Sequence, residues 1–255
     1  MRNEKGSQLP PLPVCSVLGL PYCTLSEKSI VQHLLSAALA RRPAAVFTPG
    51  ATVAAKSARS EDLRRVLLSA DMLLADGYGC LLAARLAGRR LPARTAGIDI
   101  AQALLAAADA HALRVFLYGG KEGVAERAAQ KLGERYPHLA FATADGYGDD
   151  PICEISRFSP HLVFVCLGAE RQERWILSHK AALSAVCLGL GGSLDVWSGD
   201  VRRAPLFLQR LGLEWAWRTL KEPRRALRLL PLPAYFAKCL LSRLGQNDKK
   251  EGIKE

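Results

Sequence analysis

The sequence lacks the features that mark membrane-spanning and exported proteins. No run of 18 or more uninterrupted apolar residues occurs in the 255-residue chain, so no spanning helix is expected. The first residues, MRNEKGSQLPPLPVC, contain no apolar core of a signal peptide, which predicts a loose lead-in and a cytoplasmic location. There is no internal repeat, and only the polar end QNDKKEGIKE is of low complexity. With 49% hydrophobic and 23% charged residues, the composition is that of a globular protein.

The cysteines lack the spacing of a metal site or a disulfide framework. Their number, seven, is odd, and no CxxC pair occurs. Cys166 and Cys187 lie within apolar, strand-like runs, so we interpret them as small core residues. Neither a metal nor another cofactor is expected.

Acidic residues are scarce near the C-terminus. Residues 201–255 contain 13 Lys and Arg against 5 Asp and Glu, and so carry +8 of the total net charge of +11. Such a segment indicates an anionic partner, either nucleic acid, phosphates or an acidic membrane surface, and the plain alternative is a solvated basic face. Nothing in the chain resembles an RNA- or DNA-reading motif, so no nucleic-acid partner is expected.

Short apolar runs that end in Gly or Asp-Gly alternate with amphipathic stretches such as 122–136. The runs are 44–50, 72–77, 113–120, 139–146, 161–168 and 184–192. Apolar strands that alternate with helices predict an α/β fold, a doubly wound and mostly parallel sheet of the Rossmann-like kind.

The pattern changes after residue 196, where no further strand is evident. Two or three helices are expected there, broken near Pro223 and at the sequence PLP. We therefore divide the chain into a lead-in (1–14), an α/β core (15–196), a basic helical C-terminal appendage (197–245) and a polar tail (246–255).

Ligands of such folds bind beyond the carboxyl ends of the strands, which directs attention to polar residues there. Asp76 in LADGYG is either a turn residue or a carboxylate at the mouth of a site. The segment LGAERQERWI is either a plain helix N-terminus, where acidic residues are favourable, or a site segment in which Gln172 faces the ligand crevice. Arg94 in ARTAGIDI, before a helix capped near Asp99, is either solvated or holds a phosphate in bidentate fashion.

Two glycine-rich segments carry only weak nucleotide signals. YGGKEGVAERAA (118–129) suits a phosphate at a helix N-terminus or a plain turn, and no Ser or Thr follows its Lys as a Walker A loop requires. GLGGSLDVWSG (189–199) has Leu194 where a dinucleotide fingerprint needs its third glycine, which disfavours NAD.

Arg218, Arg225 and Arg228 either clamp a diphosphate or meet lipid headgroups, and the two uses are compatible.

The ordered set DGYG, RTAGID, YGGKEGVAE, LVFVCLGAERQERWI, CLGLGGSLDVWSGDVRRAP and LGLEWAWRTLKEPRR resembles the WecG/TagA/CpsF family of bacterial glycosyltransferases over about residues 15–230. The resemblance implies a UDP-linked N-acetylmannosamine donor and an undecaprenyl-diphosphate-linked N-acetylglucosamine acceptor. It also implies an inverting, metal-independent single displacement. The product would be a β-linked disaccharide for teichoic acid, enterobacterial common antigen or capsule.

The resemblance also suggests site residues. Asp76 matches the family's catalytic base, and Thr48, Arg94 and Gln172 match its substrate-binding positions. Gly50 stands where the family usually has Asn, so one donor or acceptor contact differs here.

The appendage arginines Arg218, Arg225 and Arg228 match the family's diphosphate clamp. In the absence of a metal, they would neutralise the leaving UDP. We expect the basic appendage to dock on the anionic inner face of the plasma membrane and to close over the UDP site. The other use of such an apolar appendage is self-association away from the membrane.

Three alternatives remain open from sequence. The same fold transfers N-acetylmannosaminuronic acid or glucose in relatives. A nicotinamide-dependent oxidoreductase is disfavoured by the failed glycine fingerprint. A non-catalytic basic module would bind in a salt-sensitive manner without releasing UDP.

Overall fold

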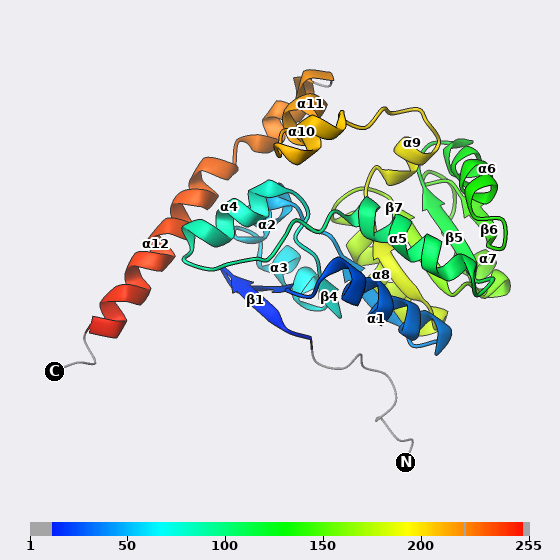
Figure 1. Ribbon diagram of the computed structural model, residues 1–255, viewed down its shortest axis with the longest axis horizontal. Coiled ribbons are helices and arrows are strands. Elements are labelled where there is room, and N and C mark those ends of the chain that lie inside the picture. The colour runs from blue at the N-terminus through cyan, green and yellow to red at the C-terminus, as the bar shows by residue number, and fades with distance from the viewer. Residues whose placement is uncertain (1–11, 222, 252–255) are drawn as a thin grey trace, which may run out of the picture.

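The chain folds around one eight-stranded sheet that carries helices on both faces (Figure 1). The computed structural model describes residues 12–221 and 223–251, so the expected lead-in and polar tail lie partly outside the described residues. The strands are β1 (Val14–Val17), β2 (Leu20–Cys23), β3 (Ala44–Phe47), β4 (Met72–Leu73), β5 (Arg114–Gly119), β6 (Ala140–Ala144), β7 (Leu162–Cys166) and β8 (Val186–Gly189).

The strand order is β1-β2-β4-β3-β8-β7-β5-β6, and every neighbouring pair is parallel except β1 and β2. The predicted α/β class with a mostly parallel sheet is therefore confirmed. The helices are α1 (Glu27–Leu39), α2 (Ala51–Ser57), α3 (Glu61–Leu68), α4 (Tyr78–Leu86), α5 (Gly97–Asp109), α6 (Val124–Arg135), α7 (Ile152–Phe158), α8 (Arg171–Leu183), α9 (Ser193–Trp197), α10 (Leu206–Arg210), α11 (Glu214–Lys221), the 3₁₀ helix η1 (Pro223–Leu229) and α12 (Leu232–Glu251).

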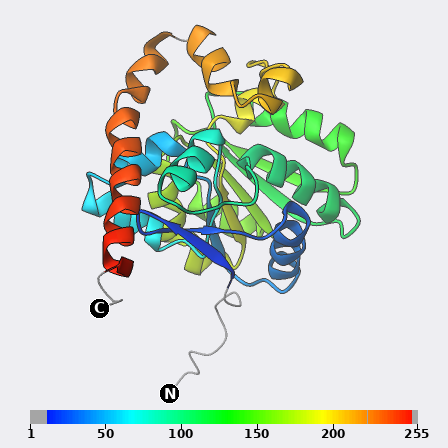
Figure 2. The ribbon, with the colours of Figure 1, turned by 60° about the vertical axis from the view of Figure 1, so that its left-hand side comes forward.

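Burial of both faces explains why the central strands β3, β7 and β8 carry no polar side chain. Along β7, Leu162 and Phe164 pack with α1, α5, α6 and α9. Val163 and Val165 point the other way and pack with α2, α3, α4 and α8. This alternation has the period of two that a strand imposes, and Figure 2 shows the helices on either side of the sheet. Cys166 and Cys187 are buried in this core, as predicted.

All six apolar runs contain a strand, but two strands were missed. β1 and β2 form a hairpin whose turn uses positive φ angles at Leu18 (47°) and Gly19 (83°). Each strand has only four residues, and Pro21 interrupts the β2 pattern, so the pair is not evident from sequence. β4 is shorter than its run, although Asp76 still pairs with Gly50 in an isolated parallel bridge.

The C-terminal helices break at the two predicted places and once more between α10 and α11, so the described residues form four helical segments from α10 to α12 where two or three were expected. η1 begins at Pro223 and α12 begins within the PLP sequence. α12 packs against α4 and α2, with Tyr235 and Cys239 buried in the same core as Tyr22 and Cys80. None of the described helices is both long and apolar enough to cross a membrane. The long helix is therefore attached to the α/β core through one buried face.

Replacing Tyr235 tests this attachment. Tyr235 is only 4% exposed. Tyr235→Ala should lower the free energy of unfolding by about 3 kcal/mol, because it removes a buried aromatic side chain. Leu241→Ala is the matched control on the same helix, is 65% exposed, and should change stability by less than about 0.5 kcal/mol. Urea titrations of the two variants compare them directly, and equal midpoints would contradict the docking of α12.

Candidate active site

The sheet brings four of the predicted residues to one edge. Thr48 and Gly50 follow β3, Asp76 follows β4, and Gln172 opens α8 after β7. β4, β3, β8 and β7 are consecutive in the sheet and parallel, so their carboxyl ends share this edge. The edge is the place where a parallel α/β sheet binds ligands.

Asp76 is a half-buried residue whose backbone extends the sheet. Its bridge to Gly50 keeps the chain extended, and the sharp turn comes one residue later at Gly77, with φ 86°. A Cβ on Gly77 would meet no atom within 4 Å, so open space adjoins the carboxylate-bearing residue. The sharp turn in LADGYG is therefore made by Gly77 and not by Asp76.

Gly50 is the N-cap of α2 and has an ordinary φ of −74°. A Cβ built there would lie 3.4 Å from the backbone oxygen of Asp76, which is normal van der Waals contact. The backbone therefore does not require glycine at this position. The missing side chain leaves the space beside Asp76 wider than a larger residue would.

Thr48 and Gln172 both hold the segment that follows β8. Thr48 Oγ1 donates to the carbonyl of Gly189 at 2.8 Å. Gln172 is 4% exposed, and its Oε1 accepts from the N–H of Gly191 at 2.8 Å. A Cβ on Gly189 would lie only 3.0 Å from Gln172 Nε2, a tight contact. Through these hydrogen bonds, Thr48 and Gln172 fix the backbone at the end of β8.

Glu173 completes the α8 N-terminus with a buried carboxylate. It accepts from Gln172 Nε2 at 2.9 Å and from the Glu170 backbone N–H at 2.6 Å, and Glu170 caps the helix in return. Burial raises the pKa of Glu173, while these hydrogen bonds oppose the rise. Glu173, the acidic residue after Gln172, therefore forms a capping box with Glu170.

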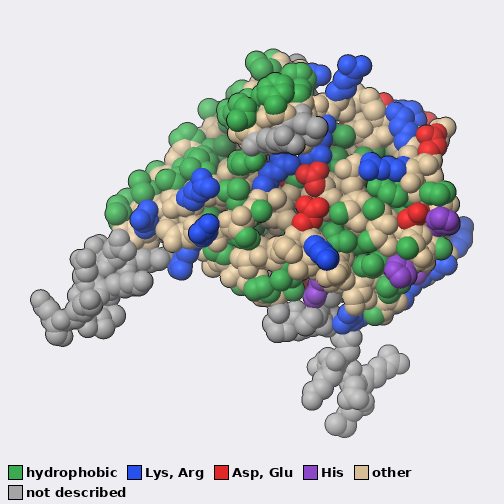
Figure 3. Space-filling model, viewed as in Figure 1, with side chains coloured by type: hydrophobic (Ala, Val, Ile, Leu, Met, Phe, Trp, Pro, Cys, Tyr) green, Lys and Arg blue, Asp and Glu red, His purple; other side chains and the backbone are tan. Residues whose placement is uncertain are grey.

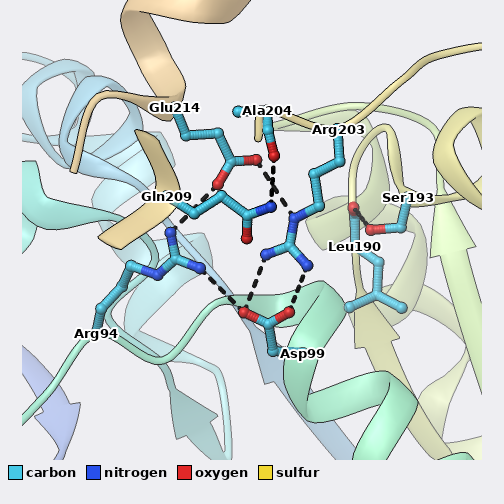
Figure 4. A network of polar contacts seen from close by, with 8 residues as sticks. All are labelled: Arg94, Asp99, Leu190, Ser193, Arg203, Ala204, Gln209 and Glu214. Atoms are coloured by element: carbon cyan, nitrogen blue, oxygen red, sulfur yellow. Dashed lines mark hydrogen bonds and ion pairs between the residues drawn. The ribbon is translucent and has the colours of Figure 1, made fainter. Parts of the chain in front are cut away.

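Arg94 lies in a network of four charges above this edge (Figure 4). Its guanidinium contacts Asp99 Oδ2 at 3.0 Å and Glu214 Oε2 at 3.2 Å. Arg203 binds both oxygens of Asp99, at 2.6 and 3.0 Å. The network joins the first turn of α5 to the segment after α9 and to the first turn of α11. It thus links the C-terminal helices to the edge of the sheet.

Asp99 and Arg203 stabilise each other's charged states. Burial disfavours the ionised form of Asp99, but Arg203 and then Arg94 outweigh it and lower the pKa of the carboxyl. Burial also opposes the charge of Arg203, but Asp99, Glu214 and Asp76 raise the pKa of its guanidinium. Asp76 is thereby electrostatically coupled to this cluster.

Tyr78, the tyrosine of LADGYG, lies under the same network. The Arg94 guanidinium lies 5.9 Å from the centre of its ring. Gly212, with φ 76°, approaches so closely that a Cβ would come within 2.6 Å of the ring. The turn between α10 and α11 therefore rests on Tyr78, beside Asp76.

Sequence reasoning gave no role to Arg203 or Glu214 and saw in Asp99 only a helix cap. α5 begins at Gly97 with Ala96 as its N-cap, so Asp99 is free to bind arginines. Glu214 is one of the few acidic residues in the arginine-rich C-terminal part. This isolation among arginines is the sequence feature that could have indicated a role for Glu214.

The predicted clamp arginines fall in α11 and η1. Arg228 is exposed, and the side chains of Arg218 and Arg225 lie outside the described part of the structure. Positions 225 and 228 share a 3₁₀ helix, where residues three apart eclipse one another. The two positions therefore lie on one face, as predicted for an α-helix.

The glycine-rich loop after β5 lies farther along the same edge. A cavity of about 490 Å³ is lined by Lys121 and Glu122 of this loop and by the loop after β6. α4 and α6 follow strands β4 and β5 at this end of the sheet. No side-chain cap bond is made at the start of α4, α5 or α6, so the first N–H groups of these helices are not occupied by a cap. Among the described residues, no group of three His, Cys, Asp or Glu side chains is arranged to hold a metal ion.

The fold and this edge are those of an α/β enzyme whose polar and charged side chains gather beyond the carboxyl ends of its strands. The model of the glycosyl transferase WecG/TagA/CpsF family matches residues 15–249, and the chain belongs to that family. The family predicted from the ordered motifs is thus confirmed.

Curated relatives resemble the chain over most of its length. A protein of Bacillus subtilis strain 168 is 35% identical over 226 residues, covering 86% of this chain and 88% of its own. A protein of Bacillus spizizenii is 36% identical over 218 residues, covering 83% and 85%. A third, from Staphylococcus aureus strain MW2, is 35% identical over 174 residues, covering 66% and 68%. Each is named N-acetylglucosaminyldiphosphoundecaprenol N-acetyl-beta-D-mannosaminyltransferase.

Removing the central carboxylate should loosen the network. Asp99→Asn should lower the free energy of unfolding at pH 7 by about 1–3 kcal/mol, because two partly buried guanidinium groups lose their shared anion. The pKa of Asp99 is lowered on folding, so its contribution is complete above the ordinary value of 3.8 and is lost as the pH falls below it. Wild type and variant should therefore converge in acid denaturation curves, and a constant gap down to acid pH would contradict this account.

Proposed function

We propose that the chain transfers N-acetylmannosamine from a UDP-linked donor to undecaprenyl-diphosphate-linked N-acetylglucosamine, in cell-surface polysaccharide synthesis of the teichoic acid type. The observation that carries the proposal is Asp76, placed at an open strand end beside an arginine cluster. The names of relatives that match more than four fifths of the chain supply the substrates.

The chemistry needs one base and no covalent intermediate. The Asp76 carboxylate accepts the proton of the acceptor hydroxyl as its oxygen attacks the anomeric carbon. The bond from that carbon to UDP breaks in the same displacement, so an α-linked donor gives a β-linked product. The open space at Gly77 and the bare backbone at Gly50 admit the two sugars on either side of Asp76.

UDP leaves as an anion, and this chain has cations to receive it. Arg94 lies at the edge, and Arg218, Arg225 and Arg228 follow in the C-terminal helices. The uncapped N-termini of α4 and α5 add donors and a partial positive charge. Fixed cations of this kind stabilise charge that develops on a leaving diphosphate, and we propose that they do so without a metal ion.

The C-terminal helices expose the surface that we assign to the membrane. Hydrophobic side chains gather over α10 and α11 beside basic ones (Figure 3). The exposed apolar residues of these helices and of η1 and α12 are Phe207, Leu211, Trp215, Leu220, Leu227, Leu230, Leu240, Leu241 and Leu244. An apolar surface among lysines and arginines suits an anionic membrane. Docking here would hold the enzyme on the inner face of the plasma membrane, where its lipid-linked acceptor is found.

Asp76→Asn tests the base. It should reduce acceptor-dependent release of UDP from UDP-N-acetylmannosamine by about 10²–10⁴-fold while the protein remains folded, because the amide cannot accept the proton. The assay uses a lipid-diphosphate-N-acetylglucosamine analogue with EDTA present. Asp62→Asn, in an exposed ion pair with Arg174, is the matched control and should keep the wild-type rate. A wild-type rate in Asp76→Asn would remove Asp76 from this role.

Leu220→Asp tests the membrane surface. Leu220 is 79% exposed on α11, and a carboxylate there should weaken binding to anionic phospholipid vesicles about tenfold or more. Leu39→Asp, which places the same charge on an exposed position of α1, should bind vesicles as the wild type does. Cosedimentation measures both variants, and equal binding by all three proteins would assign the membrane surface elsewhere.

A further inference from the structure

The two carboxylates that face Arg94 and Arg203 contact these guanidinium groups at unequal distances. Asp99, in the first turn of α5, makes three contacts of 2.6, 3.0 and 3.0 Å with the two guanidinium groups. Glu214, in the first turn of α11, lies 3.2 Å from Arg94 and 3.7 Å from Arg203 Nε. The longer distances place Glu214 as the more exchangeable partner.

Arg203 has a donor that is left unused. Its Nε is buried and has no hydrogen-bond partner among the described residues. The nearest carboxylate oxygen, Glu214 Oε1 at 3.7 Å, is too distant for a hydrogen bond. Leaving such a donor unsatisfied costs free energy, which a closer acceptor would recover. The site therefore suits an anion with more oxygens than one carboxylate.

The unused Nε donor of Arg203 belongs to a cluster that is coupled to the proposed base, Asp76. Asp76 is among the charges coupled to Arg203, so the cluster lies within electrostatic reach of the proposed base. α5 begins beside Asp99 without a side-chain cap. Gln209 of α10 donates to the Ala204 carbonyl at 2.6 Å and fixes the chain next to Arg203 (Figure 4). An anion bound here would lie between the base and the C-terminal helices.

We propose that Arg94 and Arg203 form the binding site for the diphosphate of the donor, and that the Glu214 carboxylate occupies it in the unliganded enzyme. The inference rests on the proposed function, because it takes the donor to be a nucleotide diphosphate sugar. It gives Arg203 a substrate-binding role and makes Glu214 a competitor of the substrate.

Exchange of the two anions has a mechanical consequence. The four side chains of the cluster are electrically neutral together, and departure of Glu214 leaves a net positive charge for the incoming diphosphate. A phosphate reaches both Nε and a terminal nitrogen of a guanidinium in bidentate fashion. Because Glu214 belongs to α11, its departure removes the ion pairs that hold the start of that helix to Arg94 and Arg203. The occupied site is thus coupled to the position of the apolar C-terminal helices.

The test is calorimetric titration with UDP and, separately, with inorganic pyrophosphate. Glu214→Gln should bind both about three- to tenfold more tightly than wild type, because a competing ion pair of ordinary strength is removed. Arg203→Gln should bind both at least tenfold more weakly. Asp200→Asn is the control, since it removes the same charge from an exposed pair with Arg127 and should match the wild type.

The outcomes are separable from those of the proposed function. Unchanged or weaker binding by Glu214→Gln overturns the inference, as does unchanged binding by a folded Arg203→Gln. If Arg203→Gln fails to fold, the comparison of Glu214→Gln with Asp200→Asn decides alone. If the wild type turns over the substrates but Glu214→Gln binds UDP and pyrophosphate with the wild-type affinity, the inference is refuted and the proposed function stands. Tighter pyrophosphate binding by Glu214→Gln without any sugar transfer supports the site and refutes the proposed function.

Discussion

The common direction of the strands is the constraint on which the rest of the molecule depends. Because β4, β3, β8 and β7 are parallel, the segments that follow them all emerge at one edge. Thr48, Asp76 and Gln172 meet there although more than a hundred residues separate the first from the last. The central strands β3, β7 and β8 can lack polar side chains because helices cover both faces of the sheet, and the polar residues of the candidate site lie at the strand ends.

Asp99 has a comparable place among the charges. Two guanidinium groups in a partly buried setting repel each other and lose hydration, and a shared carboxylate offsets both costs. The same carboxylate joins a loop of the α/β core to the C-terminal segment. Asp99 thus orients Arg94 and Arg203, and Arg203 is also electrostatically coupled to Asp76. Such preorganisation is what electrostatic stabilisation of a leaving group requires.

The C-terminal helices are attached by two different kinds of interaction. α12 is attached by burial of Tyr235 and Cys239 in the core, a contact that only unfolding would expose. α10 and α11 are linked to the edge by Glu214 and by the contact of Gly212 with Tyr78. Ion pairs can exchange for a substrate anion without opening an apolar core. The apolar anchor and the ion-paired contact are therefore separate, as the proposed exchange of Glu214 for a substrate anion requires.

The amino-acid sequence by itself determined the class of fold, the strand ends at which to look and the family. Each of these rests on local periodicity or on the order of short motifs, as in the run that ends at Asp76. The hairpin of β1 and β2 escaped because four-residue strands with a proline carry too little pattern. Only the tertiary structure decided that Asp99, Arg203 and Glu214 belong together. An ion pair depends on which segments approach in space, and nothing in the local sequence of a charged residue records a partner a hundred residues away.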